Sequence, residues 1–234
     1  MNDMSVSVAL HTIGQTPRPD LTPFIVAAIG VPGIVVTGAL DGLEAAGVPL
    51  PEDWDFPLET RLSDGTRVEV GASFLEPLIQ QRIRETEEQV EMHIVLCAGP
   101  FPDLVAEGAL IRPLEHACEV LEGRGVHRPL VVVPFEAQVG PALQKWKTAG
   151  FSPLMQSMDQ RPPTAQADAW LLSMGREAVS TGADALVLDY VGYPKRILDS
   201  VQEGLEVPVL DLGHLATDFV RELIDEMNGL EPEE

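Results

Sequence analysis

The sequence predicts an α/β fold made of two pseudo-symmetric, Rossmann-like halves, each with a mainly parallel sheet flanked by helices. Apolar runs of strand length alternate with amphipathic runs, and this order requires parallel pairing through right-handed crossovers. Two related octets end a later strand of each half: VLCAGPFP at 95–102 and VLDYVGYP at 187–194. We expect one half to comprise residues 1–104 plus 213–234, and the other residues 105–212.

The first half opens with a buried strand, a polar loop with two prolines at 14–20, and a helix. This helix should start near Pro23, because Asp20 or Thr22 can cap it and proline suits the first turn. It should run to about Ile29, since Gly30 can end it. From their apolar runs, strands of this half are expected at 6–14, 33–38 and 92–97, with a short helix at 40–46.

A hairpin is predicted between these parallel strands. Its arms are residues 58–63 and 66–70, and Asp64-Gly65 supplies the positive φ angles of a type I′ turn. Ser73 is then expected to cap a long amphipathic helix that runs from about Leu75 to Gln89.

The second half repeats the alternation after a short extended piece at 110–112. It too has a polar, proline-bearing loop behind its first strand, at 135–141. Its strands are expected at 129–134, 153–158, 185–189 and 207–211. Its helices are expected at 113–121, through Trp146 to near Gly150, from Thr164 to about 180, at 195–202 and at 215–227.

Composition excludes several classes of function. The net charge of −22 repels phosphate backbones and anionic membranes, so we expect neither nucleic acid nor a membrane as a partner. No apolar run approaches the roughly 18–20 residues of a membrane helix, and no signal peptide is evident. Two cysteines are too few for a disulfide framework, so we expect a reduced, cytoplasmic protein. A homodimer is left open.

Cys97 is the strongest candidate for chemistry, because an apolar strand ends on it and a tight turn with Gly99 follows. Open α/β sheets place reactive groups at such strand ends. A thiolate there can act as a base or nucleophile, although a free cysteine is also often a small buried apolar residue. Cys118 lies on a helix and is interpreted as a packing residue.

Other candidates lie on neighbouring loops. Arg18 is suited to clamping a carboxylate through two parallel hydrogen bonds, or it is a surface residue without a ligand. Tyr190 and Tyr193 can donate a phenol hydrogen, or they cover the end of the sheet. The remaining candidates for substrate binding are Gln15, Thr16, Ala98, Gly99, Pro134, Glu136 and Gly192, the glycines and prolines through the backbone around them.

Several familiar sites are missing from the sequence. There is no G-x-G-x-x-G or G-K-[ST] phosphate loop, which disfavours dinucleotide and nucleoside-triphosphate enzymes. There is no Gly-x-Ser-x-Gly elbow, and the histidines and cysteines lack metal-ligand spacing. His11 and His214 can titrate near neutrality, but each alone is more often structural. We therefore expect no cofactor and no metal.

Four segments together resemble the AroM protein family, which is similar to the aspartate/glutamate racemase superfamily. They are TIGQTPRPD at 12–20, LCAGPF at 96–101, QKW at 144–146 and LDYVGY at 188–193. The resemblance implies two pseudo-symmetric halves with an active site between them. It also implies cofactor-independent chemistry, with a cysteine from each half on opposite faces of a substrate carbon.

The sequence departs from that pattern in the second half. The racemase motif reads like Leu-Gly-Cys-Thr-x-Tyr-Pro, which places Tyr190 at the cysteine, whereas overlay of the octets places Asp189 opposite Cys97. Two-thiol racemisation is therefore not the leading hypothesis. We expect a lyase or isomerase with Cys97 and Tyr190 as catalytic residues and a small carboxylate as ligand. The alternative is a non-catalytic protein that binds such a carboxylate.

Overall fold

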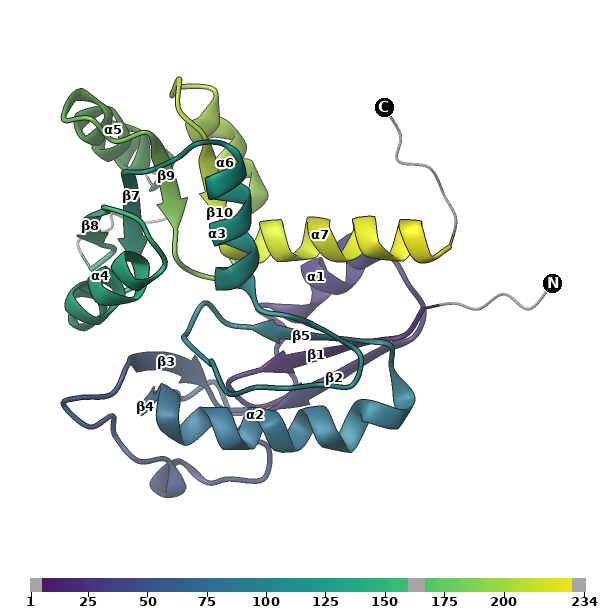
Figure 1. Ribbon diagram of the computed structural model, residues 1–234. Helices are drawn as coiled ribbons and strands as arrows, with labels where there is room; N and C mark the ends of the chain where they lie inside the picture. The colour runs from purple at the N-terminus through teal and green to yellow at the C-terminus, as the bar shows by residue number, and fades with distance from the viewer. Residues whose placement is uncertain (1–5, 160–166, 229–234) are drawn as a thin grey trace. The chain divides into compact units, whose positions relative to one another are not determined.

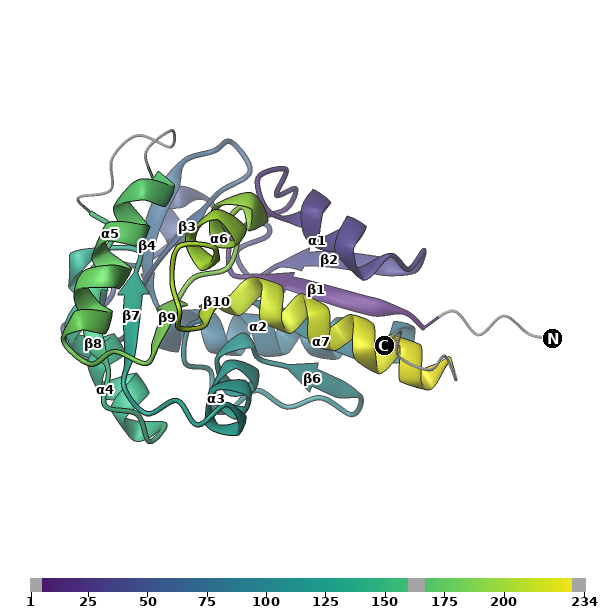
Figure 2. The same cartoon turned by 90° about the horizontal axis from the view of Figure 1, so that it is seen from above.

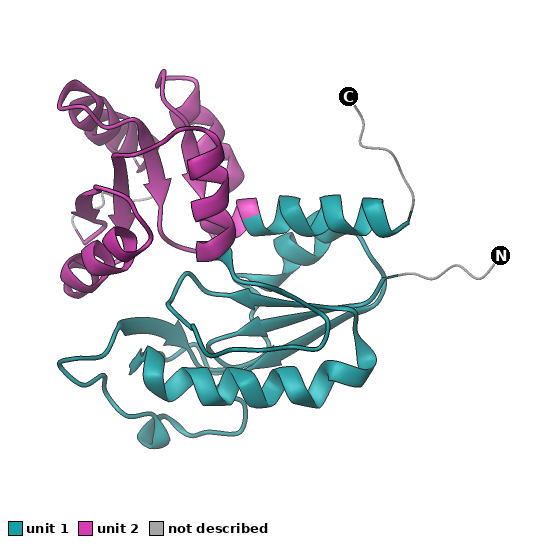
Figure 3. Cartoon of the chain, in the orientation of Figure 1, with its two compact units in different colours: residues 1–113, 216–234 teal, residues 114–215 magenta. Residues whose placement is uncertain are grey.

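The computed structural model describes residues 6–159 and 167–228. Contacts divide the chain into two compact units, residues 1–113 with 216–234 and residues 114–215 (Figure 3). No helix in the described ranges is both long enough and apolar enough to span a membrane.

The first unit contains a parallel sheet of four strands (Figure 1). In spatial order they are β2 (Ile34–Gly38), β1 (Val8–Thr12), β5 (Met92–Leu96) and β6 (Ala109–Ile111). Helix α2 (Ala72–Thr86) lies along one face, and α1 (Thr22–Ile29) lies along the other with residues 216–227 of α7 (Leu212–Met227) (Figures 1 and 2). The expected parallel sheet between helices is confirmed.

The second unit repeats this topology. Its strands, in spatial order, are β8 (Leu154–Ser157), β7 (Pro129–Val133), β9 (Ala185–Leu188) and β10 (Val209–Asp211). Its helices are α3 (Pro113–Gly123), α4 (Val139–Thr148), α5 (Ala167–Ser180) and α6 (Lys195–Gln202), and the expected start of α5 at Thr164 lies outside the described residues. In both units the chain visits the sheet in the order second, first, third, fourth strand, so the predicted pseudo-symmetry is confirmed.

Each unit has its own apolar core. In the first, Leu75, Ile79 and Ile83 of α2 pack with Val95 of β5 and with Leu58. In the second, side chains of α5 and α6 pack on the sheet; among them are Leu171, Ile197, Val201, Leu130 and Leu186. These cores hold the strand ends that carry the candidate residues.

The predicted caps of α1 are wrong. The N-cap residue is Leu21, and no side chain caps the helix. Asp20 binds Arg18 instead, and the Thr22 hydroxyl donates to the Arg18 carbonyl oxygen at 2.8 Å. Gly30 does end the helix, in the left-handed conformation that favours glycine.

The predicted helix at 40–46 is also wrong, because only a short 3-10 turn, η1 (Ala45–Gly47), forms there. Gly42 has φ +86°, a left-handed conformation that interrupts a right-handed helix. Asp41 uses its carboxylate to bind the backbone of Gly38 and Thr16. This segment is therefore a loop at the end of the first sheet.

The hairpin forms as β3 (Pro57–Arg61) and β4 (Arg67–Gly71), but its turn is not type I′. Gly65 has φ +87°, and no other residue type in the described ranges has a positive φ, so Asp64 lacks the positive φ of a type I′ turn. The Gly65 N–H donates to the Leu62 carbonyl at 3.0 Å. This is a type I turn followed by a left-handed glycine.

Helix α2 begins earlier than predicted, and Ser73 is not its cap. Gly71 is the N-cap residue, and Asp55 accepts hydrogen bonds from the backbone and the hydroxyl of Ser73. A Cβ on Gly71 would lie 1.9 Å from Asp55 Oδ2. Glycine is therefore required for this approach. The helix continues into a 3-10 turn, η2 (Glu87–Gln89), so the expected end near Gln89 is close.

Candidate active site

The candidate residues of the first unit lie at the carboxyl edge of its sheet. Thr12 at the end of β1 pairs in register with Leu96 of β5 and with Gly38 of β2. The three loops that follow these strands therefore begin side by side. In open α/β sheets, ligands bind at this edge.

Cys97 follows β5 directly and is buried, with 8% of its surface exposed. It belongs to the apolar core with Ile13 and Phe101. The Gly99 N–H donates to Cys97 Sγ at 3.3 Å, and such a donor favours the thiolate over the thiol. A Cβ on Gly99 would lie 3.0 Å from the Phe101 ring, so glycine keeps this turn tight. Ala98, between them, is also buried.

The other thiol has a different environment. Cys118 lies on α3, and burial raises its pKa to about 11. The nearby Lys145 ammonium opposes that shift only in part. A thiol of this kind stays protonated at neutral pH and is a poor nucleophile.

Gln15 ties three loops together. Its Nε2 donates to the carbonyl oxygens of Leu40 and Leu43, at 2.8 and 2.6 Å. Its Oε1 accepts from the Ser63 N–H at 2.8 Å. Since Gln15 is buried and both ends of its amide are engaged, it holds the loop in place.

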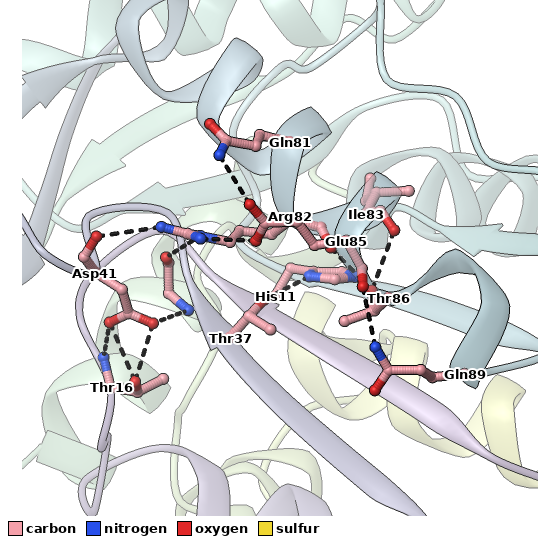
Figure 4. Close-up of polar contacts among 11 residues, drawn as sticks. His11, Thr16, Thr37, Asp41, Gln81, Arg82, Ile83, Glu85, Thr86 and Gln89 are labelled. Carbon is pink, nitrogen blue, oxygen red and sulfur yellow. Dashed lines mark hydrogen bonds and ion pairs between the residues drawn. The ribbon is translucent and has the colours of Figure 1, made fainter.

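Thr16 is held by Asp41 (Figure 4). Its backbone N–H donates to Asp41 Oδ1 at 2.7 Å, and its hydroxyl lies 3.0 Å from Oδ2. Arg82 of α2 donates in turn to the carbonyl oxygens of Gly38 and Asp41, at 3.0 and 3.1 Å. The 14–17 loop is therefore fixed to the sheet end and to α2.

Arg18 is buried, with 8% exposed, and its fork already holds a carboxylate. Nε and Nη2 donate to the two oxygens of Asp20 at 2.8 and 2.9 Å, and this bond keeps the pKa of Asp20 low. Nη1 lies 3.1 Å from Thr12 Oγ1 and 3.4 Å from Thr60 Oγ1. The residue expected to bind a substrate carboxylate thus binds an internal one.

In the second unit, Asp189 and Tyr190 are the two candidate counterparts of Cys97. Leu188, the last residue of β9, pairs with Val132, which is the last but one of β7, whereas Leu96, the last residue of β5, pairs with Thr12 at the end of β1. Asp189 follows β9 directly, as Cys97 follows β5. Tyr190 is one residue beyond that position.

Asp189 is engaged in a buried ion pair. Lys145 Nζ lies 2.8 Å from its Oδ1 and 2.7 Å from its Oδ2, and the Trp146 indole N–H donates to Oδ2 at 2.7 Å. The QKW and LDYVGY segments therefore meet around one carboxylate. Because its charge is compensated and its oxygens are occupied, Asp189 is poorly placed to act as a base.

The tyrosines differ in environment. Tyr190 is 40% exposed, whereas Tyr193 is 2% exposed and its hydroxyl has no hydrogen-bond partner among the described residues. Gly192 between them has φ +114°, a conformation that favours glycine. Gly192 is therefore needed for the backbone conformation of this loop, and its predicted role in substrate binding stays a prediction.

Pro134 directly follows β7, and Glu136 begins η3 (Glu136–Gln138) two residues later. Its backbone N–H donates to Asp159 Oδ2 at 2.6 Å, and its Oε2 accepts from the Ser157 hydroxyl at 2.9 Å. These bonds attach Glu136 to the segment around β8. Neither contact indicates a ligand.

Sequence reasoning missed the pairing of Asp211 with His214. Asp211 ends β10, and its Oδ1 lies 2.9 Å from both the backbone nitrogen and the Nδ1 of His214. Burial raises the pKa of Asp211. The sequence carries Asp211 and His214 as a D-x-x-H motif at the end of a strand. The two side chains meet only if the helix starts at Leu212, as it does, and not at 215 as predicted.

Metal ligation has no support in the described ranges, which contain no group of three or more His, Cys, Asp or Glu side chains able to hold an ion. The polar groups of the edge are instead donors, thiols and paired carboxylates. This chemistry suits binding of a small anion and transfer of a proton.

Comparison with known families decides the relationship. Residues 8–227 match the family model described as AroM protein. The chain belongs to the AroM family. The four segments that carried the resemblance all lie within the matched range, and no curated protein matches the sequence.

Solved structures share the fold of this AroM-family chain at low identity. Allantoin racemase from Klebsiella pneumoniae is 19% identical with a TM-score of 0.64, over 98% of this chain and 91% of that one. Unliganded arylmalonate decarboxylase is 14% identical with a TM-score of 0.64, over 94% and 93%. An aspartate racemase homologue from Pyrococcus horikoshii OT3 is 12% identical with a TM-score of 0.59, over 94% and 99%. The fold is therefore that of racemases and decarboxylases.

Proposed function

We propose that this AroM-family protein is a cofactor-independent lyase or isomerase that acts on a small carboxylate, with Cys97 as its acid, base or nucleophile. The observation that carries the proposal is the position of Cys97. It follows a central strand at the carboxyl edge of the first sheet, and the Gly99 N–H donates to its sulfur. The likeness of the fold to racemases and a decarboxylase supports the same class of reaction.

A proton transfer to or from carbon fits these groups. In a decarboxylation the bond between the α-carbon and one carboxylate breaks, CO2 leaves, and the electron pair stays on carbon as an enolate. The Cys97 thiol then delivers its proton to that carbon and becomes a thiolate. Backbone N–H groups of the Cys97 turn, together with Arg18, are the donors proposed to stabilise the enolate oxygens.

The deciding experiment compares Cys97→Ser with Cys118→Ser. Both remove one sulfur, but Cys118 is the high-pKa thiol of α3. The substrate panel contains amino acids, malonates and maleate, followed by NMR for racemisation, decarboxylation and isomerisation. We expect Cys97→Ser to lower kcat by at least about 100-fold, as loss of an acid–base group does, and Cys118→Ser to leave it unchanged. Undiminished turnover by Cys97→Ser would exclude the catalytic role.

The second candidate function is a binding protein that keeps a carboxylate site without chemistry. The ion pair of Asp189 with Lys145 favours it, because Asp189, which follows β9 as Cys97 follows β5, is engaged in structure. The reactivity of Cys97 separates the two functions. A Cys97 that acts as base or nucleophile reacts with a thiol reagent faster than a simple thiol at pH 7 and is protected by malonate, whereas a binder's buried thiol reacts slowly.

A further inference from the structure

Residues 21–40 form the longest uncharged stretch of the chain, although 22% of all residues are charged. The stretch comprises α1, the turn after it and the edge strand β2, and residues 34–37 of that strand are only half-buried. The exposed residues of α1 are all uncharged: Pro23, Phe24, Ala27 and Ala28. Figure 2 shows α1 lying beside β2, at the edge of the first sheet opposite β6. An uncharged and partly exposed face, here called the α1–β2 face, therefore runs along this edge.

Strand β2 is an open edge of its sheet, because within the described ranges it pairs only with β1. It is also the longest edge strand of the two parallel sheets: it has five residues, whereas β6 and β10 have three and β8 has four. Proteins protect such edges with a lysine, a proline, a bulge or an inward-pointing charge. Ile34–Gly38 has none of these, so β2 can pair with a further strand.

Hydrogen bonds show which backbone groups of β2 point to the open edge. The Val8 N–H donates to the Gly33 carbonyl oxygen at 3.0 Å. At the other end of the strand, the Ala39 N–H donates to the Thr12 carbonyl oxygen at 2.9 Å. The odd-numbered residues of this strand thus direct their backbone groups to β1. Because successive residues of a strand alternate between its two edges, the even-numbered residues direct theirs to the open edge.

Three even-numbered residues reach that edge: Ile34, Val36 and Gly38. The chain itself occupies the groups of Gly38, whose N–H donates to Asp41 Oδ2 at 2.7 Å and whose carbonyl oxygen accepts from Arg82 Nε at 3.0 Å. The N–H and C=O of Ile34 and Val36 remain for a strand outside the described part of the chain.

A second copy of this chain is the partner that the α1–β2 face suits. At a net charge of −22 two copies repel each other, and the repulsion is weakest where the approaching faces carry no charge. A basic protein would instead contact acidic side chains, which residues 21–40 lack. An anionic membrane is repelled by the rest of the surface.

We propose that the protein is a homodimer in which β2 of each copy pairs antiparallel with β2 of the other, about a two-fold axis at Val35. In this register Ile34 lies opposite the partner's Val36, and each of the two such pairs exchanges two backbone hydrogen bonds. An axis at Ile34 would require Pro32, which has no N–H, and an axis at Val36 would require Gly38, whose groups are occupied. The interface is isologous and brings both α1 helices to the same face of one continuous sheet. The proposal goes beyond the proposed function and does not depend on Cys97.

The first test is the mass of the protein in solution, measured by sedimentation at physiological ionic strength. At about 100 μM, above the Kd of a standard interface, the wild type should have twice the 25.3 kDa of one chain. Val35→Lys places two ammonium groups opposite each other and should raise the Kd of the dimer at least about 100-fold. Val105→Lys adds the same charge at a valine that is 63% exposed and lies outside the α1–β2 face, so it should leave the Kd unchanged.

Two outcomes of sedimentation would overturn the proposal. They are a monomeric wild type and a dimer that Val35→Lys leaves intact. If a monomeric wild type binds vesicles of neutral phosphatidylcholine, the α1–β2 face belongs to a lipid surface instead.

A cysteine pair tests the register and does not depend on how well Val35→Lys folds. Facing residues at the axis form a non-hydrogen-bonded pair with Cα atoms about 4.5 Å apart, which a disulfide can bridge, so Val35→Cys should form a linked dimer under mild oxidation. Gly33→Cys is the control, because a Cβ there meets Ser7 Cβ only at 3.4 Å, while the two new thiols lie about 14 Å apart along the strands. It should run as a monomer on a non-reducing gel, as should the wild type with its two native cysteines. Equal cross-linking of both variants, or none in Val35→Cys, would overturn the proposal.

Discussion

His11 and His93 face each other across neighbouring strands of the first sheet, with Nε2 of His11 3.0 Å from Nδ1 of His93. Their rings are stacked at 5.3 Å, and the Thr37 hydroxyl lies 2.7 Å from the other nitrogen of His11 (Figure 4). Burial, with a smaller contribution from His93, lowers the pKa of His11 to about 3. Burial also lowers the pKa of His93, and Glu87 opposes that shift. Both rings are therefore neutral in the folded protein.

Stability should fall as the pH drops below about 6.5. The folded pKa of each ring lies below the unfolded value, so the unfolded chain binds more protons from there downward. One such histidine lowers the free energy of unfolding by about 1.4 kcal/mol per pH unit, or about 2 kcal/mol between pH 6.5 and 5. Urea unfolding from pH 8 to 5 measures this slope. His11→Gln should flatten it, and an equal slope in that variant would contradict the assignment.

Asp20→Asn should tighten binding of a small carboxylate to Arg18. The Asp20 carboxylate occupies the Arg18 fork, and its side chain is 38% exposed against 10% for Arg18, so it can be replaced by an external anion. A bidentate, charge-assisted pair contributes about 1.5–3 kcal/mol, and we expect the Kd for malonate to fall at least about tenfold. Calorimetric titration measures it.

Asp41→Asn is the matched control, because it loosens the same loop at Thr16 without touching the Arg18 fork. Its Kd for malonate should not fall. Equal tightening in both variants would mean that loop mobility, and not competition by Asp20, sets the affinity.

Gly71→Ala should destabilise the protein by about 1–3 kcal/mol, since the new Cβ would lie 1.9 Å from Asp55 Oδ2 and displace the residue that holds Ser73. Gly123→Ala in α3 is the comparison, because its Cβ meets nothing within 4 Å. That change should stabilise the chain by up to about 1 kcal/mol through helix propensity. Thermal unfolding of both variants should give Tm shifts of opposite sign.

Asp189→Ala should lower the free energy of unfolding by about 3–5 kcal/mol, because it removes the carboxylate that compensates the charge of the buried Lys145 ammonium. Lys145→Met/Asp189→Ala should cost less than the sum of the single changes. The exposed Lys195–Asp199 pair is the control, and Asp199→Ala should cost at most about 0.5 kcal/mol. Additive losses in urea unfolding would argue against a coupled pair.

The architecture was predictable because strand and helix periods are local properties, and the octets marked equivalent points of the two sheets. The predictions that were wrong concerned contacts between residues distant in the sequence, or the backbone conformation of single residues. Asp20 binds Arg18 and does not cap α1, Asp55 replaces Ser73 at α2, and Gly42 breaks a helix whose other residues favour it.

The candidate site was predictable only in part for the same reason. Cys97 could be placed at a strand end from its neighbours alone, whereas Lys145 and Trp146, which hold Asp189, lie 44 and 43 residues before it in the sequence. The pairing of Asp211 with His214 could be recognised only from the three-dimensional position of the first turn of α7. Which residue a side chain contacts depends on the tertiary structure, and it cannot be read from a single sequence.

The strand order shared by the two units has a consequence for descent. Two copies of an ancestral half that assembled as separate identical chains would carry the same residue at both equivalent positions. Joined in one chain, the copies can mutate independently. Cys97 after β5 and Asp189 after β9 differ in this way: a thiol follows one strand, and a carboxylate held by Lys145 and Trp146 follows the other. Because both units belong to one chain, a substitution in one unit leaves the other unchanged, and the two strand ends can carry different chemistry.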